Sequence, residues 1–136
     1  MVFLVKSLLK AGLTLGAIAA VLKSNPDDIA KVAYSVTKNF KNLECTSCAA
    51  ALRDVFKAKG VSGEVIQLTP KGGGYWNIWS DLAADNIGRT GFHQAVKVGD
   101  TVFDNIHKKG VPYAEWIKDF STSGPNGLVV TTIETF

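Results

Sequence analysis

The spacing of apolar residues changes at Gly60, and this change constrains the fold more than any other feature of the sequence. Before Gly60, apolar residues recur at the three- and four-residue intervals of helices, over about 25–39 and 47–59. After Gly60, short runs rich in β-branched and aromatic residues indicate strands instead. The expected strands are 64–68, 75–79, 92–98, 101–106 and 128–133, with a short helix at 113–120. Helices followed by hairpin-connected strands predict an α+β domain with an antiparallel sheet.

Local signals predict where these elements begin, end and pair. Asn25 before Pro26 is typical of a helix N-cap and first helical position, and Gly60 suits the left-handed residue that ends a helix. We expect 64–68 to pair with 75–79 around the glycine-rich loop 71–74. That loop is not a predicted phosphate site, because no Gly-Lys-Ser/Thr sequence follows and no helix begins there.

Residues 2–23 form an apolar run with helical spacing. The residues on its apolar face are Leu4, Leu8, Ala11, Leu15, Ile18 and Leu22. We therefore divide the chain into an apolar helix at 1–24, which either packs on the domain or serves delivery as a signal peptide, and a globular domain at 25–136. Lys10 leaves too few consecutive apolar residues for a transmembrane helix, so no stable membrane span is expected.

The composition excludes several classes of protein. A hydrophobic content of 46% in 136 residues is typical of a globular domain rather than a disordered chain. The net charge of +3 is too small, and the basic residues too scattered, for a nucleic-acid-binding surface. Cys45 and Cys48 are the only cysteines; a local disulfide between them and two free thiols are both compatible with the sequence.

These cysteines lie where the second helix is expected to begin. Thr46 or Ser47 is a suitable N-cap, and alanines that favour helix formation follow. The positive end of the helix dipole stabilises a thiolate, which is the nucleophilic form of cysteine. The segment therefore predicts a reactive thiol at a helix start.

A predicted hairpin supplies partners for such a thiol. If Gly99-Asp100 is a two-residue turn, Val98 faces Thr101, and His93 becomes a diagonal neighbour of Asp104 on one face. A one-residue change of register would bring Asn105 to His93 instead. A thiol, an imidazole and an acid that orients the imidazole are the parts of a nucleophilic enzyme that needs no cofactor and no metal.

The segment Cys45-Thr46-Ser47-Cys48-Ala49-Ala50 resembles the active-site stretch of papain-like cysteine proteases, in which the second cysteine is the nucleophile. The resemblance implies that Cys48 is the nucleophile, His93 the general base and acid, and Asp104 the residue that orients His93. It also implies that Asn42 donates to the oxyanion, although this family has glutamine there. Ala49 departs from the aromatic residue that follows the nucleophile in papain.

The region from about 42 to 120 resembles more closely the papain-fold toxin domains of bacterial polymorphic toxin systems. The matching motifs are Cys45–Leu52, Gly91-Phe92-His93, Val102–His107, Gly110-Val111-Pro112 and Trp116. This resemblance implies a cysteine protease that is secreted or delivered into the cytoplasm of a competing bacterial cell. There it would cleave a protein substrate through an acyl-enzyme, and a cognate immunity protein would block it.

Other interpretations of the same residues stay open. Cys45 rather than Cys48 could be the nucleophile, and the pair could be a thioredoxin-like dithiol. Cys45, Cys48, His93 and His107 could bind zinc, although the histidine spacing is unusual; otherwise His107 is expected to be a solvated loop residue. The same triad could serve a deamidase or transglutaminase that acts on side-chain amides, and the chain could also be a non-catalytic binding module.

Overall fold

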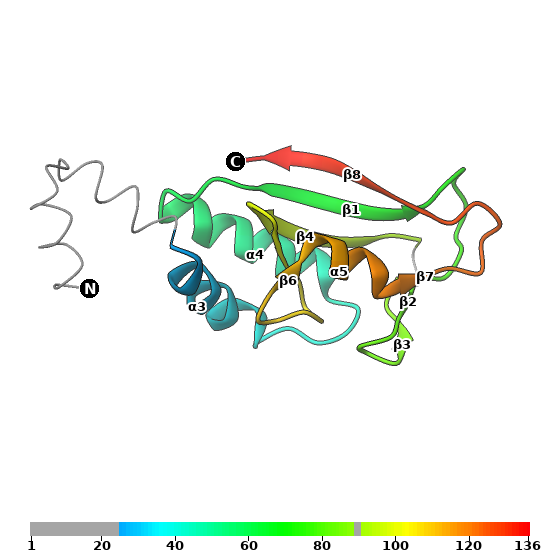
Figure 1. The fold of residues 1–136 in the computed structure, drawn as a ribbon, viewed down its shortest axis with the longest axis horizontal. Coiled ribbons are helices and arrows are strands. Elements are labelled where there is room, and N and C mark those ends of the chain that lie inside the picture. The colour runs from blue at the N-terminus through cyan, green and yellow to red at the C-terminus, as the bar shows by residue number, and fades with distance from the viewer. Residues whose placement is uncertain (1–24, 89–90) are drawn as a thin grey trace, which may run out of the picture.

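A computed structural model describes residues 25–88 and 91–136, and it confirms the predicted α+β class (Figure 1). The expected helix at 1–24 lies outside the described residues, and the division of the chain at residue 24 stays a prediction. The elements in chain order are α3 (Pro26–Thr37), α4 (Cys45–Ala58), β1 (Glu64–Pro70), β2 (Trp79–Ser80), β3 (Asp85–Asn86), β4 (His93–Val98), β5 (Thr101–Phe103), β6 (Val111–Pro112), α5 (Tyr113–Lys118), β7 (Phe120–Ser121) and β8 (Leu128–Thr135).

Five strands form an antiparallel sheet in the order β6-β5-β4-β1-β8. The predicted edge strand near the C-terminus is confirmed as β8, which runs beside β1 over its whole length (Figure 1). A second, small sheet has the order β3-β2-β7.

The predicted pairing of 64–68 with 75–79 is wrong. Both edges of β1 are occupied, by β4 on one side and β8 on the other. After the loop, in which Gly72, Gly73 and Gly74 have positive φ angles, the chain leaves the large sheet and enters the small one. Of the expected partner strand, only Trp79 is in a strand, and that strand belongs to the small sheet.

Alternating strand residues divide the core into two clusters, one on each face of the large sheet. Val65, Val96 and Phe103 pack with α3 and α4 in the first cluster. The second cluster contains Ile66, Leu68, Ala95 and Val102, which pack with Trp116 of α5 and with residues of the small sheet. The sheet is therefore covered on both sides.

The two long helices begin differently, since a side chain caps α3 and none caps α4. Asn25 caps α3 as predicted, because its side chain accepts hydrogen bonds from the backbone of Asp27 and Asp28. The second helix begins at Cys45, two residues earlier than predicted, and Glu44 rather than Thr46 or Ser47 is at the N-cap position. The turn before α4 is fixed by a hydrogen bond from the Lys41 N–H to the Glu44 carboxylate. Gly60 has φ +72° and ends α4 as expected.

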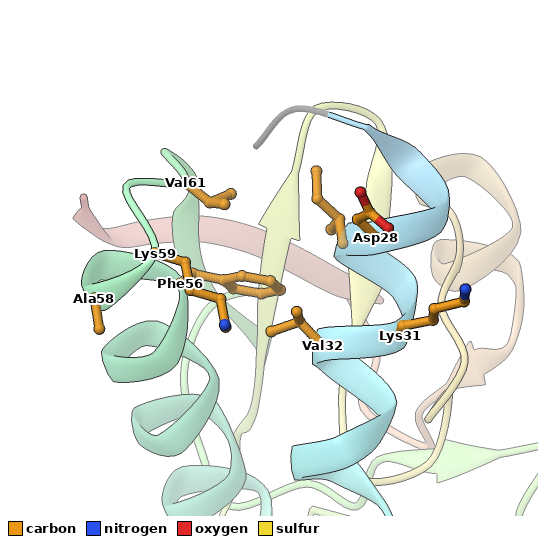
Figure 2. A pocket seen from close by; sticks show the side chains of 8 residues that line it. Asp28, Lys31, Val32, Phe56, Ala58, Lys59 and Val61 are labelled. Atoms are coloured by element: carbon orange, nitrogen blue, oxygen red, sulfur yellow. The ribbon is translucent and has the colours of Figure 1, made fainter. Parts of the chain in front are cut away.

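An open pocket of about 500 Å³ lies between α3 and the C-terminal end of α4 (Figure 2). Its lining residues are Asp28, Ile29, Lys31, Val32, Phe56, Ala58, Lys59 and Val61. None of the predicted catalytic residues lines it, so the candidate site has to be sought elsewhere. Within residues 25–88 and 91–136, no helix is long and apolar enough to cross a membrane.

Candidate active site

The hairpin of β4 and β5 brings His93 and Asp104 together. The predicted register is confirmed, because Val98 pairs with Thr101 across the turn. Nε2 of His93 donates a hydrogen bond of 2.8 Å to Oδ2 of Asp104, and both side chains are fully buried. Asn105, the alternative partner, does not bind His93; its amide donates to the Lys41 carbonyl at 2.7 Å.

The Asp104 carboxylate lies in a cage of hydrogen-bond donors. Oδ2 also accepts from the Trp116 indole at 2.8 Å. Oδ1 accepts from the backbone N–H groups of Ile106 and His107 and from Nδ1 of His107. Burial raises the pKa of Asp104, but the hydrogen bonds and charges of His107 and His93 outweigh this effect and hold its pKa well below the ordinary value. Asp104 is therefore an anion in a fixed orientation.

Cys45 is the thiol beside His93. It is the first residue of α4, where the helix dipole favours a thiolate. Burial raises its pKa, but hydrogen bonding and charge from His93, together with the Gln94 backbone, outweigh burial and lower the pKa below its ordinary value. Since Nε2 of His93 is bound to Asp104, Nδ1 is the nitrogen left for the thiol. Nδ1 is buried and has no hydrogen-bond partner among the described residues, so it is available to accept the thiol proton when substrate binds.

Cys48 has a different environment. Its side chain has no exposed surface and packs in the first core cluster with Leu52 and Phe56. Burial, with the negative charge of Asp104, raises the pKa of Cys48 to about 12. His93 therefore interacts with Cys45, whereas Cys48 lies among the core residues of α3, α4 and the sheet.

Burial and hydrogen-bonded partners shift the pKa of His93 in opposite directions. Burial lowers its pKa, but the hydrogen bonds and charges of Asp104 and Cys45 outweigh it and raise the pKa to about 9. The imidazole also lies 6.3 Å from the Trp116 ring and 5.3 Å from the Phe120 ring, between centroids. These contacts fix the plane of the ring. The raised pKa of His93 and the lowered pKa of Cys45 favour an imidazolium beside a thiolate.

A family model described as papain fold toxin 2 matches residues 28–121, which is more than half of the chain. The chain belongs to this family of papain-fold toxins. No curated protein and no solved structure gives a significant match. The match includes α3, α4 and every residue of the toxin's thiol–imidazole–carboxylate arrangement, and it ends before β8.

The toxin's predicted oxyanion donor, Asn42, is engaged elsewhere. Its Nδ2 donates to Oδ2 of Asp85 at 3.0 Å, which uses one of its two N–H groups and orients the amide toward Asp85. The backbone N–H groups of Cys45, Thr46 and Ser47 make no backbone hydrogen bonds with the described residues, and no side chain caps the helix. The first turn of α4 is therefore the better donor set for an oxyanion.

Sequence reasoning missed His107. His107 was expected to be a solvated loop residue, but it is only 5% exposed. Its Nδ1 lies 2.9 Å from Oδ1 of Asp104, and its Nε2 lies 3.0 Å from Oδ2 of Asp119. Its position three residues after Asp104 was a signal that it could bind this carboxylate, but nothing in the sequence paired it with Asp119. In the part of the chain that the structure describes, no group of three or more potential ligands is arranged to hold a metal ion.

Proposed function

We propose that this papain-fold toxin is a cysteine peptidase that cleaves a protein of a target bacterial cell, with Cys45 as the nucleophile. His93 is the general base and acid, and Asp104 orients His93. The observation that supports this proposal is the buried His93–Asp104 hydrogen bond beside the one cysteine whose pKa is lowered. The assignment replaces Cys48, which the resemblance implied, because Cys48 is enclosed in the core.

Each group has a defined role in acylation. Nδ1 of His93 holds the proton of the Cys45 thiol, and the Asp104 carboxylate keeps the proton on Nε2. The thiolate sulfur attacks the carbonyl carbon of a peptide bond, and the N–H groups at the start of α4 stabilise the oxyanion. The tetrahedral intermediate collapses as Nδ1 gives its proton to the leaving amine, which leaves a thioester on Cys45.

Hydrolysis of this thioester reverses the proton transfers. A water molecule gives its proton to Nδ1 of His93 as its oxygen attacks the thioester carbonyl. Collapse of the second intermediate releases a carboxylic acid and the Cys45 thiolate, and the proton on Nδ1 restores the thiolate–imidazolium pair. The Asp104 cage keeps the imidazole in one orientation through both steps.

The test compares the two cysteines as a matched pair. Cys45→Ala should abolish growth inhibition when the toxin is expressed in bacteria, with a loss of roughly 10⁴-fold or more in turnover. Cys48→Ala should keep the activity and cost about 1 kcal/mol of stability. If Cys45→Ala remains toxic, the proposed chemistry is rejected.

Analysis of proteins from intoxicated cells identifies the reaction. Peptide-bond cleavage produces fragments with new N-termini that are missing from cells expressing Cys45→Ala. A side-chain deamidase would leave chain lengths unchanged and replace an amide by an acid, and a transglutaminase would join chains. Either of those results would replace the peptidase assignment while keeping the triad.

We also propose that the toxin is delivered to the target-cell cytoplasm and has a cognate immunity protein. The net charge of +3 favours an acidic partner, and a small acidic protein encoded beside the toxin is the candidate. Co-expression of that protein should restore growth, and the two should co-purify. A neighbouring protein that neither binds nor protects would contradict this partner assignment.

A further inference from the structure

His107 connects the site to the small sheet through both of its ring nitrogens. Nδ1 lies 2.9 Å from Oδ1 of Asp104, and Nε2 lies 3.0 Å from Oδ2 of Asp119. A carboxylate oxygen accepts hydrogen bonds and does not donate them. An imidazole between two carboxylates can satisfy both contacts only when both nitrogens carry protons. The geometry is therefore that of a buried cation between two anions.

The second carboxylate, Asp119, is itself firmly held. Its Oδ2 accepts from the Ser80 hydroxyl at 2.6 Å, and its Oδ1 accepts from the Leu82 backbone at 2.8 Å. Asp119 follows directly after α5, and Ser80 is in β2. The position of His107 is thus fixed from an element outside the hairpin that carries the catalytic pair.

The groups around His107 come from several elements. Asp104 lies in its own segment and Asp119 at the end of α5, while His93 of β4 is the positive group that opposes its protonation. The Phe120 ring of β7 meets its imidazole edge-on at 5.6 Å. Burial lowers the pKa of His107, but the two carboxylates outweigh burial and His93 and raise it. The raised pKa of His107 agrees with the doubly protonated ring that its two hydrogen bonds require.

We propose that His107 is a positioning residue, whose imidazolium clamps Asp104 against Asp119 and so holds the carboxylate at His93. Nδ1 of His107 lies 2.9 Å from Oδ1 and 3.1 Å from Oδ2 of Asp104, and Oδ2 is the oxygen that binds His93. This inference rests on the proposed function and adds a residue that no sequence motif assigned to catalysis. Among the described residues, the hydrogen bonds of the His107 ring go to the two carboxylates and not to Cys45 or His93. His107 acts through Asp104, by holding the carboxylate and by partly neutralising it.

The test measures the reactivity of Cys45 directly, so it needs no known substrate. All variants carry Cys48→Ala, which leaves Cys45 as the sole cysteine of the chain. The rate of alkylation by iodoacetamide is followed against pH for His107→Gln and Asp119→Asn. The matched control is Lys109→Gln, which removes one positive charge from an exposed side chain of the same segment.

We expect His107→Gln to move the midpoint of the alkylation profile to higher pH by roughly one unit, which is about a tenfold slower reaction below the midpoint. Loss of the cation disfavours the thiolate, and a displaced Asp104 no longer supports the imidazolium that stabilises it. Asp119→Asn should shift the midpoint in the same direction by less. Lys109→Gln should leave the profile unchanged.

A folded His107→Gln protein with the same midpoint and toxicity as the control would overturn the proposal. If His107→Gln does not fold, Asp119→Asn decides: an unchanged midpoint rejects the clamp, and a raised one supports it. Failure of the proposed function gives a different result, because Cys45→Ala would then remain toxic whatever the alkylation profile of the His107 variants.

Discussion

At the scale of single residues, the two cysteines differ in partners more than in burial. Both side chains are buried, with exposed fractions of 6% for Cys45 and 0% for Cys48. A thiolate in an apolar interior is costly unless a cation or hydrogen-bond donors compensate it. His93 and the Gln94 backbone provide this compensation for Cys45, whereas the charge of Lys108 is outweighed at Cys48 by burial and by Asp104.

Single-cysteine variants should show this difference in their alkylation near neutral pH. The thiol of Cys45 in Cys48→Ala should react readily, and His93→Ala should move its profile toward that of an ordinary thiol. The thiol of Cys48 in Cys45→Ala should react only in denaturant, because it is enclosed and protonated. Equal rates for the two native single-cysteine proteins, measured by intact mass, would contradict the assignment.

The activity of the site should have a defined pH range. The thiolate–imidazolium pair is lost below the lowered pKa of Cys45 and above that of His93, at about 9. Toxin-dependent cleavage should therefore fall on both sides, with an alkaline limb near pH 9. Because the folded pKa of His93 is raised, its contribution to stability is present below its unfolded pKa and lost as the pH rises through about 9. An alkaline limb that is unchanged in a variant lacking the Asp104 carboxylate would contradict this account.

Asp104→Asn should lower the activity, and it should remove the part of the unfolding free energy that is lost at acidic pH. The folded pKa of Asp104 is depressed, so its stabilising effect is present above the unfolded value of about 3.9 and lost as the pH falls below it. At neutral pH the variant should lose roughly 3 kcal/mol, because a buried ion-paired group has been removed. Thermal unfolding across pH measures this, and Glu115→Gln on the exposed surface of α5 is the matched control. Equal losses at acidic and neutral pH would indicate simple packing damage.

At the scale of elements, the loop after β5 must return the chain to the sheet without disturbing Asp104. Gly110 makes this return at φ +86°, and a Cβ atom there would lie 2.4 Å from Cε1 of Phe103. Thr37 of α3 holds the same loop by donating a hydrogen bond of 2.7 Å to the Lys108 carbonyl. The loop that carries Asp104 and His107 is therefore fixed by its own backbone and by a neighbouring helix.

Gly110→Ala should cost roughly 2–4 kcal/mol, because a strained φ adds to a clash with a buried ring. Gly99→Ala is the matched control: its φ is also positive, at +60°, but a Cβ atom there meets nothing within 4 Å. That variant should lose only about 1 kcal/mol. Chemical denaturation of both proteins measures the difference, and equal losses would mean that the contact with Phe103 carries no cost.

At the scale of the whole molecule, β8 completes the sheet and core of the domain, although this strand lies outside the family match. It lies beyond residue 121, yet it covers the full edge of β1, and the Phe136 ring that follows it stacks on Phe56 at 6.5 Å. Without β8, the backbone of β1 would become an exposed edge, which favours aggregation. The strand that carries His93 and the last strand of the chain thus pair with the two edges of the same strand, β1.

Removal of residues 128–136 should give an insoluble or unfolded chain, although every catalytic residue is retained. Phe136→Ala should lose roughly 3 kcal/mol but remain folded, because β8 still pairs with β1. Solubility and circular dichroism of the two proteins check this. A soluble, toxic truncation would show that β8 is dispensable.

The sequence by itself determined the helix and strand classes, the Gly99-Asp100 hairpin and the pairing of His93 with Asp104, because turn chemistry and strand alternation are local rules. It did not determine the partners of β1, which depend on contacts between residues far apart in the chain. It also did not determine which cysteine meets His93, since both lie in the first turn of α4 and the groups around them come from other elements. Only the tertiary structure decided that choice and brought Asp119 to His107, because burial and electrostatic pairing arise from elements that meet in space.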